Sequence, residues 1–251
     1  MNLVIDVGNT TVKAGIFEGE NLVLKGEFAT QSRKEADEWG ILICSWVGKF
    51  IRGRIKKVVL ASVVPSVSNP LKMGIEKYLR LSPIEVIPEK VEIPLLYDDP
   101  KQLGADRIAN AIALIKLYKL PAIAVDFGTA TTFDVVSQKG EYLGGVIAPG
   151  VMTFLESLPR RTERLFSVEF KKPNRVIGTN TTDNLISGIF YSCLGAVKEI
   201  IRGIKGELGK EVRVIATGGL VDLIKDECDE IDEVNPILTL QGLNFIGENW
   251  I

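Results

Sequence analysis

The chain contains no histidine, and this absence removes a whole set of catalytic and metal sites. Ser-His-Asp and Cys-His catalysis, zinc sites with histidine ligands and histidine general bases are all excluded. Proton transfer must therefore depend on Asp, Glu, Lys, Tyr or Cys. The three cysteines, Cys44, Cys193 and Cys228, are far apart, odd in number and outside any CxxC motif. They are typical of reduced thiols, and we expect a cytoplasmic protein.

The sequence also lacks an excess of charge and a long apolar run. Lys and Arg number 30 against 32 Asp and Glu, and the net charge of -2 offers no general attraction to nucleic acid or anionic membranes. A basic cluster at 52–57 has no interleaved aromatic residues and is more typical of a solvated helix end than of a nucleic-acid site. No apolar run is long enough to cross a bilayer, and Asp6 interrupts the first one, which argues against a signal peptide. We expect neither a nucleic acid nor a membrane as partner.

The sequence is organised around an apolar strand that ends in Asp-x-Gly and occurs twice. The first copy spans Leu3–Lys13 and the second Ala122–Thr132. Each copy continues into a second strand and a turn, Gly19-Glu20 in one case and Gly140-Glu141 in the other. The repetition predicts two similar half-domains, 1–115 and 116–251, with the boundary near residues 112–121.

Strands and helices alternate along the chain, which places it in the α/β class. Apolar spacing and turn residues predict strands at 2–8, 12–17, 21–28, 56–62, 84–87, 122–126, 131–137, 142–148 and 212–216. Helices are expected after a capping box at Ser32-Arg33-Lys34-Glu35, at 69–81, 151–159 and 182–204, and after Thr217-Gly218-Gly219. One more helix runs to Lys119 and starts either at Asp99-Pro100 or after Gly104. An apolar-periodic segment, 236–246, closes the chain.

The two Asp-x-Gly turns have the composition of a phosphate site. Gly, Asn and Thr allow backbone N–H groups to converge on an anion. An Asp lies immediately upstream of each turn, Asp6 or Asp126, where it suits Mg²⁺ or another cation. One such turn alone is equally typical of an ordinary hairpin. Two copies, together with Thr217-Gly218-Gly219, favour nucleotide binding. The chain contains neither a P-loop nor a GxGxxG motif.

The three turns resemble the phosphate-1, phosphate-2 and adenosine motifs of the acetate and sugar kinase, Hsp70 and actin superfamily. That resemblance implies two duplicated ribonuclease-H-like domains with an ATP cleft between them. Further motifs resemble the type III pantothenate kinases: Gly104-Ala105-Asp106-Arg107, Asp126 to Thr132, Gly145-x-Ile147-x-Pro149-Gly150 and Ile177-Gly178-x-Asn180-Thr181. Members of this family phosphorylate pantothenate to 4'-phosphopantothenate, the first step of coenzyme A biosynthesis.

The resemblance implies a role for each matched residue. Asp6 would lie near Mg²⁺, Lys13 would add positive charge, and Thr129 would contact ATP. The ATP phosphates would be cradled by Asp6, Val7, Gly8, Asn9, Thr10, Thr11, Val12 and Lys13. Asp126 would hold a monovalent cation, K⁺ or NH₄⁺. Asp106 would be the general base that takes the proton of the pantothenate hydroxyl. The substrate contacts would be Tyr97, Gly104, Ala105, Asp106, Arg107 and Thr181.

Several alternatives stay open at this point. Arg107 also suits a salt bridge on a helix surface, and Thr181 also suits the cap of the long helix. The basic segment 158–165 either lines the substrate entrance or forms a solvated loop. The acceptor is pantothenate or another small hydroxyl compound such as a sugar, and a non-catalytic transcriptional accessory factor is the remaining alternative. The resemblance implies a homodimer, to which the 182–204 helix could contribute.

Overall fold

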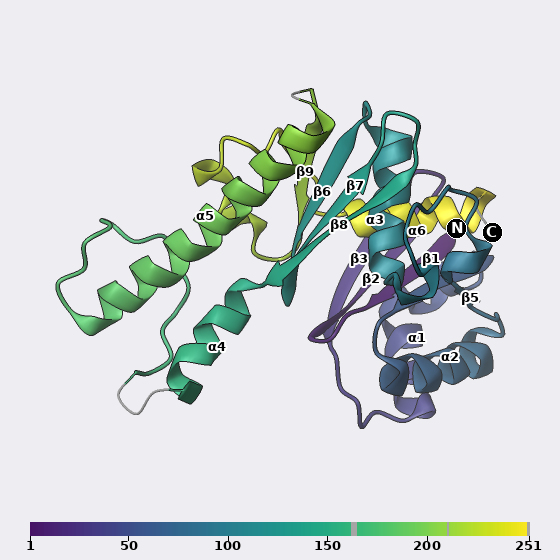
Figure 1. Cartoon of the computed structure of the whole chain (residues 1–251). Helices are drawn as coiled ribbons and strands as arrows, with labels where there is room; N and C mark the ends of the chain where they lie inside the picture. The colour runs from purple at the N-terminus through teal and green to yellow at the C-terminus, as the bar shows by residue number, and fades with distance from the viewer. Residues whose placement is uncertain (162–164, 210, 250–251) are drawn as a thin grey trace. The chain divides into compact units, whose positions relative to one another are not determined.

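The computed structural model describes residues 1–161, 165–209 and 211–249, and the chain divides into two units (Figure 1). The first unit comprises Met1–Lys116 and Leu238–Ile251, and the second comprises Leu117–Ile237. The sequence pattern assigned all of 116–251 to the second half. The final helix α6 (Leu238–Asn249) instead packs against β1 (Asn2–Val7) and β4 (Lys57–Ser62), so it belongs to the first unit.

The first unit is built on a five-stranded mixed sheet with the order β3-β2-β1-β4-β5. The remaining strands are β2 (Thr11–Glu18), β3 (Asn21–Ala29) and β5 (Ile84–Glu85). β1 runs antiparallel to β2 and parallel to β4. Four of its six residues are fully buried, because helices cover both faces of the sheet.

The side chains of β1 alternate between those two faces. Leu3, Ile5 and Val7 join the hydrophobic core formed with α1 (Ala36–Arg52) and α2 (Pro65–Leu79). Val4 and Asp6 face the opposite side, where α6 lies. A Cβ placed on Gly15, which pairs with Val4, would be 3.4 Å from a methyl group of Leu240 in α6. Asp6 therefore lies on the sheet face that α6 covers.

Helix starts in the first unit differ from the sequence expectation. α1 begins at Ala36, with Glu35 as N-cap and a capping box between Glu35 and Glu38, so the predicted box at Ser32 is wrong by one turn. α2 begins at Pro65 rather than 69, because proline is well accommodated in the first helical turn. Both proposed starts of the next helix are partly realised. Asp99 caps a short 3-10 turn, Pro100–Gln102, and α3 (Ala105–Leu117) starts after Gly104.

The second unit repeats the first. Its sheet has the order β10-β9-β6-β7-β8, which read from the other edge has the same pattern of parallel and antiparallel neighbours as the first sheet. Its strands are β6 (Ala122–Phe127), β7 (Ala130–Val136), β8 (Tyr142–Pro149), β9 (Arg213–Thr217) and β10 (Glu233–Val234). The predicted duplication is confirmed.

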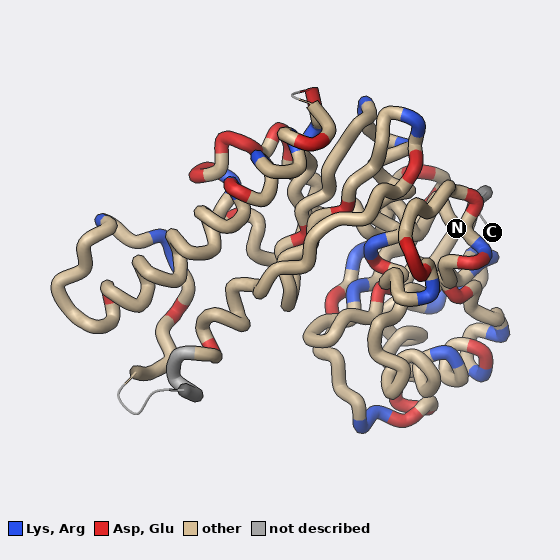
Figure 2. Tube along the Cα trace, viewed as in Figure 1, with Lys and Arg blue, Asp and Glu red and all other residues tan. Residues whose placement is uncertain are grey.

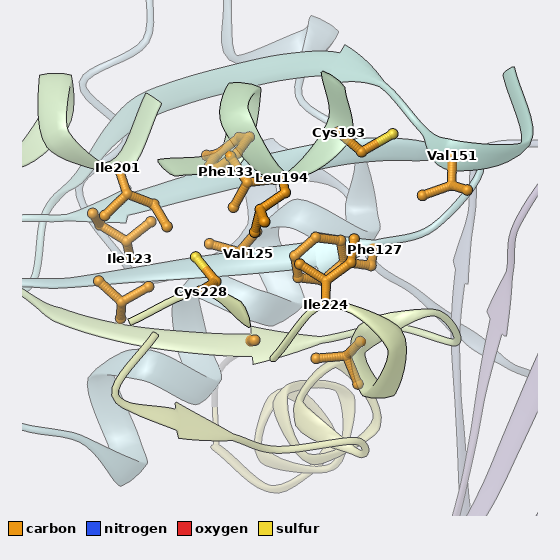
Figure 3. Packing of buried hydrophobic residues seen from close by; sticks show 14 of the residues in the cluster. Ile123, Val125, Phe127, Phe133, Val151, Cys193, Leu194, Ile201, Ile224 and Cys228 are labelled. Atoms are coloured by element: carbon orange, nitrogen blue, oxygen red, sulfur yellow. The ribbon is translucent and has the colours of Figure 1, made fainter. Parts of the chain in front are cut away.

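One core of apolar side chains holds the second unit together (Figure 3). Val125, Phe127 and Phe133 from the sheet pack against Leu194 and Ile201 of α5. α5 (Thr181–Leu208) and α4 (Val151–Arg161) are its two α-helices among the described residues. α5 is long and apolar enough to cross a membrane by composition, but half of that stretch is buried, as in the core helix of a globular unit.

One expectation for the second unit, the helix after Gly219, is wrong, and another, the role of the basic segment 158–165, concerns residues that the structure describes only in part. After Gly219 the chain forms two 3-10 turns, Val221–Leu223 and Lys225–Glu227, instead of a helix. Val221 and Ile224 are buried and three residues apart, which is the spacing of a 3-10 turn. Residues 162–164 of the basic segment lie outside the described residues, and its role is not tested. Basic and acidic residues both occur in each unit along the described trace (Figure 2).

Candidate functional site

The first Asp-x-Gly turn joins β1 to β2. The Gly8 N–H donates to the Thr11 carbonyl at 3.1 Å, which closes the turn and leaves Asn9 and Thr10 exposed. The Thr30 hydroxyl donates to the Gly8 carbonyl at 2.7 Å, and the Thr30 N–H donates to the Thr10 carbonyl at 3.0 Å. The turn is therefore fixed from its carbonyl side. Thr30 was not singled out from the sequence, because it follows β3 and meets the turn only in the folded sheet.

Asp6 and Lys13 stand opposite each other in the β1–β2 register, with Val7 opposite Val12. Opposite residues of an antiparallel pair share one face, so the Asp6 and Lys13 side chains lie on the same side of the sheet. Both are half-buried. Lys13 also faces Glu27 on β3. The pKa of the Glu27 carboxyl is lowered by its ion pair with Lys25 and, to a smaller extent, by Lys13, which places the Lys13 charge close to this carboxylate.

A second group of expected site residues forms the start of α3. The Asp106 Oδ1 accepts from the Arg107 N–H at 2.9 Å, and the Gly104 carbonyl accepts from the Ile108 N–H at 3.2 Å. A Cβ on Gly104 would lie 2.4 Å from the Asp106 Oδ1, so the absence of a side chain there gives the carboxylate its place. Ala105 is buried between them. The positive end of the helix dipole favours a carboxylate at this position.

The side chain of Arg107 is only 6% exposed. The alternative of a helix-surface salt bridge is therefore wrong. A guanidinium is rarely buried unless other groups satisfy it, so a buried arginine beside Asp106 is a stronger candidate for a functional role than a surface one.

Tyr97 lies half-buried in the loop that precedes α3. Ile93 and Leu103 are buried on either side of it in sequence and anchor this loop. Gln102 donates to the Asp99 carboxylate at 3.0 Å, which fixes the short turn between Tyr97 and α3. Buried residues and this hydrogen bond therefore hold the loop on both sides of Tyr97.

The second Asp-x-Gly turn, between β6 and β7, is one residue shorter than the first. Phe127 pairs with Thr131, and the Gly128 N–H donates to the Ala130 carbonyl at 3.1 Å. Asp126, at the end of β6, is half-buried and Thr129 is exposed at the tip of the turn. Two glycines approach this turn from other elements.

Gly218 is the first of these glycines. It follows β9, which runs parallel to β6, and has a φ of 100°. A Cβ on it would lie 2.5 Å from the Phe127 nitrogen and 2.6 Å from the Asp126 Oδ1. Only glycine fits there, for reasons of both backbone angle and space. The structure thus brings the Thr217-Gly218-Gly219 motif and the Asp126 motif together.

Gly150 is the second. A Cβ on it would lie 2.2 Å from the Thr129 carbonyl oxygen, and the Thr153 hydroxyl of α4 donates to the same oxygen at 3.3 Å. The turn therefore rests on the first turn of α4. Thr153 was missed from the sequence, since its partner lies 24 residues away.

Thr181 is the exposed first residue of α5. The cap of this helix is Asn180, whose side-chain oxygen accepts from the Asp183 N–H at 2.9 Å. The alternative in which Thr181 caps the helix is therefore wrong, and its hydroxyl is not committed to that role.

Comparison with known proteins identifies the family. The profile of the type III pantothenate kinases matches residues 2–203. A type III pantothenate kinase of Moorella thermoacetica is 44% identical over 252 residues, which cover 99% of each chain. Another, from Syntrophus aciditrophicus, is 43% identical and covers 98% of each. The chain belongs to the type III pantothenate kinase family.

Solved structures similar to this type III pantothenate kinase family member confirm the fold. A Campylobacter jejuni protein described as a Baf family transcriptional activator has a TM-score of 0.63 at 21% identity and covers 98% of both chains. A ROK hexokinase from Thermus thermophilus has a TM-score of 0.51 at 11% identity and covers 98% of this chain and 97% of its own. At such identities the likeness shows the fold alone, and it is the actin-like ATPase fold expected from the three turns.

Proposed function

We propose that this protein transfers the γ-phosphoryl group of ATP to the hydroxyl of pantothenate and forms 4'-phosphopantothenate, the first step of coenzyme A biosynthesis. The observation that carries the proposal is the identity of more than 40% to type III pantothenate kinases along nearly the whole chain. The two Asp-x-Gly turns support it, as does the start of α3, where the half-buried Asp106 precedes the buried Arg107.

ATP binding is assigned to the two turns. Asn9 and Thr10 offer an exposed backbone for the phosphates, and Lys13 adds charge beside Asp6. Thr129 is the contact from the second turn. Phosphoryl transfer requires mainly positioning and charge compensation, which rigid turns and cations supply.

Asp106 is assigned as the general base. Its carboxylate is held in one orientation by the Arg107 N–H and lies at a helix start, where it is free to accept a proton from a substrate hydroxyl. Arg107 is assigned to the substrate or to the charge that develops on the migrating group. Tyr97, Gly104, Ala105 and Thr181 complete the proposed substrate contacts.

Mg²⁺ and a monovalent cation, K⁺ or NH₄⁺, are assigned to Asp6 and Asp126. Among the described residues no cluster of three or more His, Cys, Asp or Glu side chains could hold a metal ion. The single carboxylate of Asp6 still fits Mg²⁺, which usually keeps water and substrate phosphates as its other ligands. At Asp126 the adjoining backbone oxygens suit a large monovalent ion. Bound cations would neutralise phosphate charge.

A homodimer in the cytoplasm completes the proposal. Only half of the apolar stretch of α5 is buried. Ile147 of β8 and Ile177 before α5 are 65% and 78% exposed, and Tyr191 of α5 is 38% exposed. A second copy would cover such apolar surface, and sedimentation velocity measures whether one does.

The test is a panel of acceptors, pantothenate and small sugars, assayed with ATP and Mg²⁺ in the presence and absence of K⁺. We expect turnover with pantothenate only and dependence on the monovalent cation. Asp106→Asn should lower kcat by roughly 10²–10⁴-fold while ATP binding survives, because a general base is lost. Asp222→Asn is the control, since Asp222 is exposed and its ion pair with Lys225 lies on the surface.

Each outcome has a separate meaning. Near wild-type turnover in Asp106→Asn contradicts the role of Asp106 alone. Turnover of a sugar in place of pantothenate selects the other acceptor class. No turnover with any acceptor, together with DNA binding that weakens with salt, favours the transcriptional accessory factor.

A further inference from the structure

The helix that carries Asp106 and Arg107 is held by the last helix of the chain. α3 and α6 cross with their backbones in contact, since a Cβ on Gly242 would lie 1.9 Å from the Ala109 carbonyl oxygen. Beside this contact the Thr239 hydroxyl donates to the Asn110 Oδ1 at 2.8 Å. Asn110 is 1% exposed and Thr239 is 5% exposed. This buried polar pair joins the two helices through a side-chain hydrogen bond.

α6 is itself fixed to the sheet at its other end. Asn2 of β1 donates to the Asn244 Oδ1 at 3.0 Å, and the Asn244 side chain donates to the Gly19 carbonyl at 2.9 Å. The Lys57 ammonium of β4 donates to the Gly247 carbonyl at 2.6 Å. Thus the C-terminal half of α6 is hydrogen-bonded to the end of the sheet at which β1 begins, and the first turn of α6 is hydrogen-bonded to α3.

A hydrogen bond adds a defined direction to the contact between the two helices, which apolar packing alone lacks. Burial of apolar surface is non-directional, whereas a hydrogen bond requires a defined donor, acceptor and angle. Asn110 lies four residues after Asp106, so the two side chains share one face of α3 about one turn apart. A bond that fixes the rotation of α3 at Asn110 therefore also fixes the direction in which the Asp106 carboxylate points.

We infer that Thr239 and Asn110 are positioning residues for the phosphoryl transfer. They set the rotation and height of α3 over the sheet that carries the Asp6 turn. The inference rests on the proposed function, because it takes Asp106 as the base.

The test compares four variants of the full-length protein. Thr239→Val keeps the shape and removes the hydroxyl, and Thr239→Ser restores it. Asn244→Leu is the matched control, because it removes a buried hydrogen-bonding side chain from the same helix without touching α3. Gly242→Ala pushes α3 away while every hydrogen-bonding group is kept. Steady-state kinetics with ATP and pantothenate and thermal unfolding are measured for each.

We expect Thr239→Val to lower kcat roughly 10- to 100-fold, since a misplacement of about 1 Å has an effect of that order. The KM for ATP should stay within about twofold, because ATP is assigned to other elements, and Thr239→Ser should recover most of kcat. Asn244→Leu should lose as much thermal stability and keep kcat within about twofold of wild type. Equal kcat losses in Thr239→Val and Asn244→Leu would show a merely structural role and overturn the inference.

Two further comparisons apply if Thr239→Val does not fold or if the wild-type protein is inactive on pantothenate. If Thr239→Val does not fold, Gly242→Ala measured against Gly247→Ala gives the same comparison, because a Cβ on Gly247 meets only a Val59 methyl group at 2.6 Å. If the wild-type protein does not phosphorylate pantothenate, the proposed function fails. Hydrogen exchange then decides the positioning claim by itself. The backbone amides in the first two turns of α3 must exchange faster in Thr239→Val than in Asn244→Leu, or faster in Gly242→Ala than in Gly247→Ala. Equal exchange in the variant and its control overturns the claim.

Discussion

Gly150 offers a sharp test of the second phosphate turn. Its neighbours are backbone atoms of the turn itself: a Cβ would lie 2.2 Å from the Thr129 carbonyl oxygen and 2.8 Å from that of Gly128. Carbon–oxygen contacts of this kind settle near roughly 3.5 Å. Gly150→Ala must therefore move the turn or the start of α4 by about 1 Å, because backbone atoms cannot rotate away as a side chain can.

A displacement of this size is large for a catalytic site. Misplacement by about 1 Å lowers rates by up to roughly 10²-fold, and overpacking in a filled site costs about 1–3 kcal/mol of stability. We expect kcat/KM for ATP to fall roughly 10- to 100-fold in Gly150→Ala. ATP is titrated at saturating pantothenate in an assay of ADP release, and nucleotide affinity is measured separately by calorimetry.

The control is Gly206→Ala in α5. Gly206 is exposed, and a Cβ there meets nothing within 4 Å. Alanine has the higher helix propensity, so this variant should be slightly more stable and fully active. If Gly150→Ala is less stable but keeps the wild-type kcat/KM for ATP, the turn that holds Thr129 takes no part in ATP binding.

Two predictions concern stability. Gly74→Ala should lower the free energy of unfolding by about 1–3 kcal/mol, because its Cβ would lie 2.3 Å from the Ala36 carbonyl where α1 and α2 cross. Urea unfolding measures this against Gly53→Ala, which has open space, and equal stability would contradict it. Burial raises the pKa of the Cys193 and Cys228 thiols from 9.0 to about 11. The thiols of the unfolded chain then ionise at a lower pH than the buried thiols of the folded protein. The contribution of the two thiols to the free energy of unfolding is therefore intact below pH 9 and is lost as pH rises toward 11. A Cys193→Ala/Cys228→Ala variant should show a smaller stability loss over that range, and an unchanged slope would contradict the reasoning.

The repeated half-domain was predictable because its signals are local. A buried strand, an Asp-x-Gly turn and a second strand lie within eleven residues, and the chain repeats them. The pairing of β1 with β2 and of β6 with β7 follows from turn length. The residues at the two turns and at the start of α3 were all named from the sequence.

Other features depended on packing that no local pattern encodes. By local chemistry Ser32 is the better N-cap, whereas α1 begins three residues later with Glu35 as its N-cap. The sequence left a helix-surface salt bridge open as an alternative for Arg107, whereas the fold buries this residue. Thr30 and Thr153 support the two turns from distant elements.

The position of α6 was the main miss. Its apolar residues would suit either sheet, since each offers an apolar face. Its packing against β1 and β4, the fit of Gly242 against Ala109 and the Asn110–Thr239 bond assign it to the first unit.

The chain returns to the first unit at α6, after the second unit, and this order has a consequence for synthesis on the ribosome. The first unit is discontinuous, and its sheet face stays uncovered until residues 238–249 emerge. The second unit, 117–237, is complete before them. Domains usually fold in the order in which they are made. Here the unit that begins first finishes last, so the nascent chain carries an exposed apolar sheet face through most of its translation.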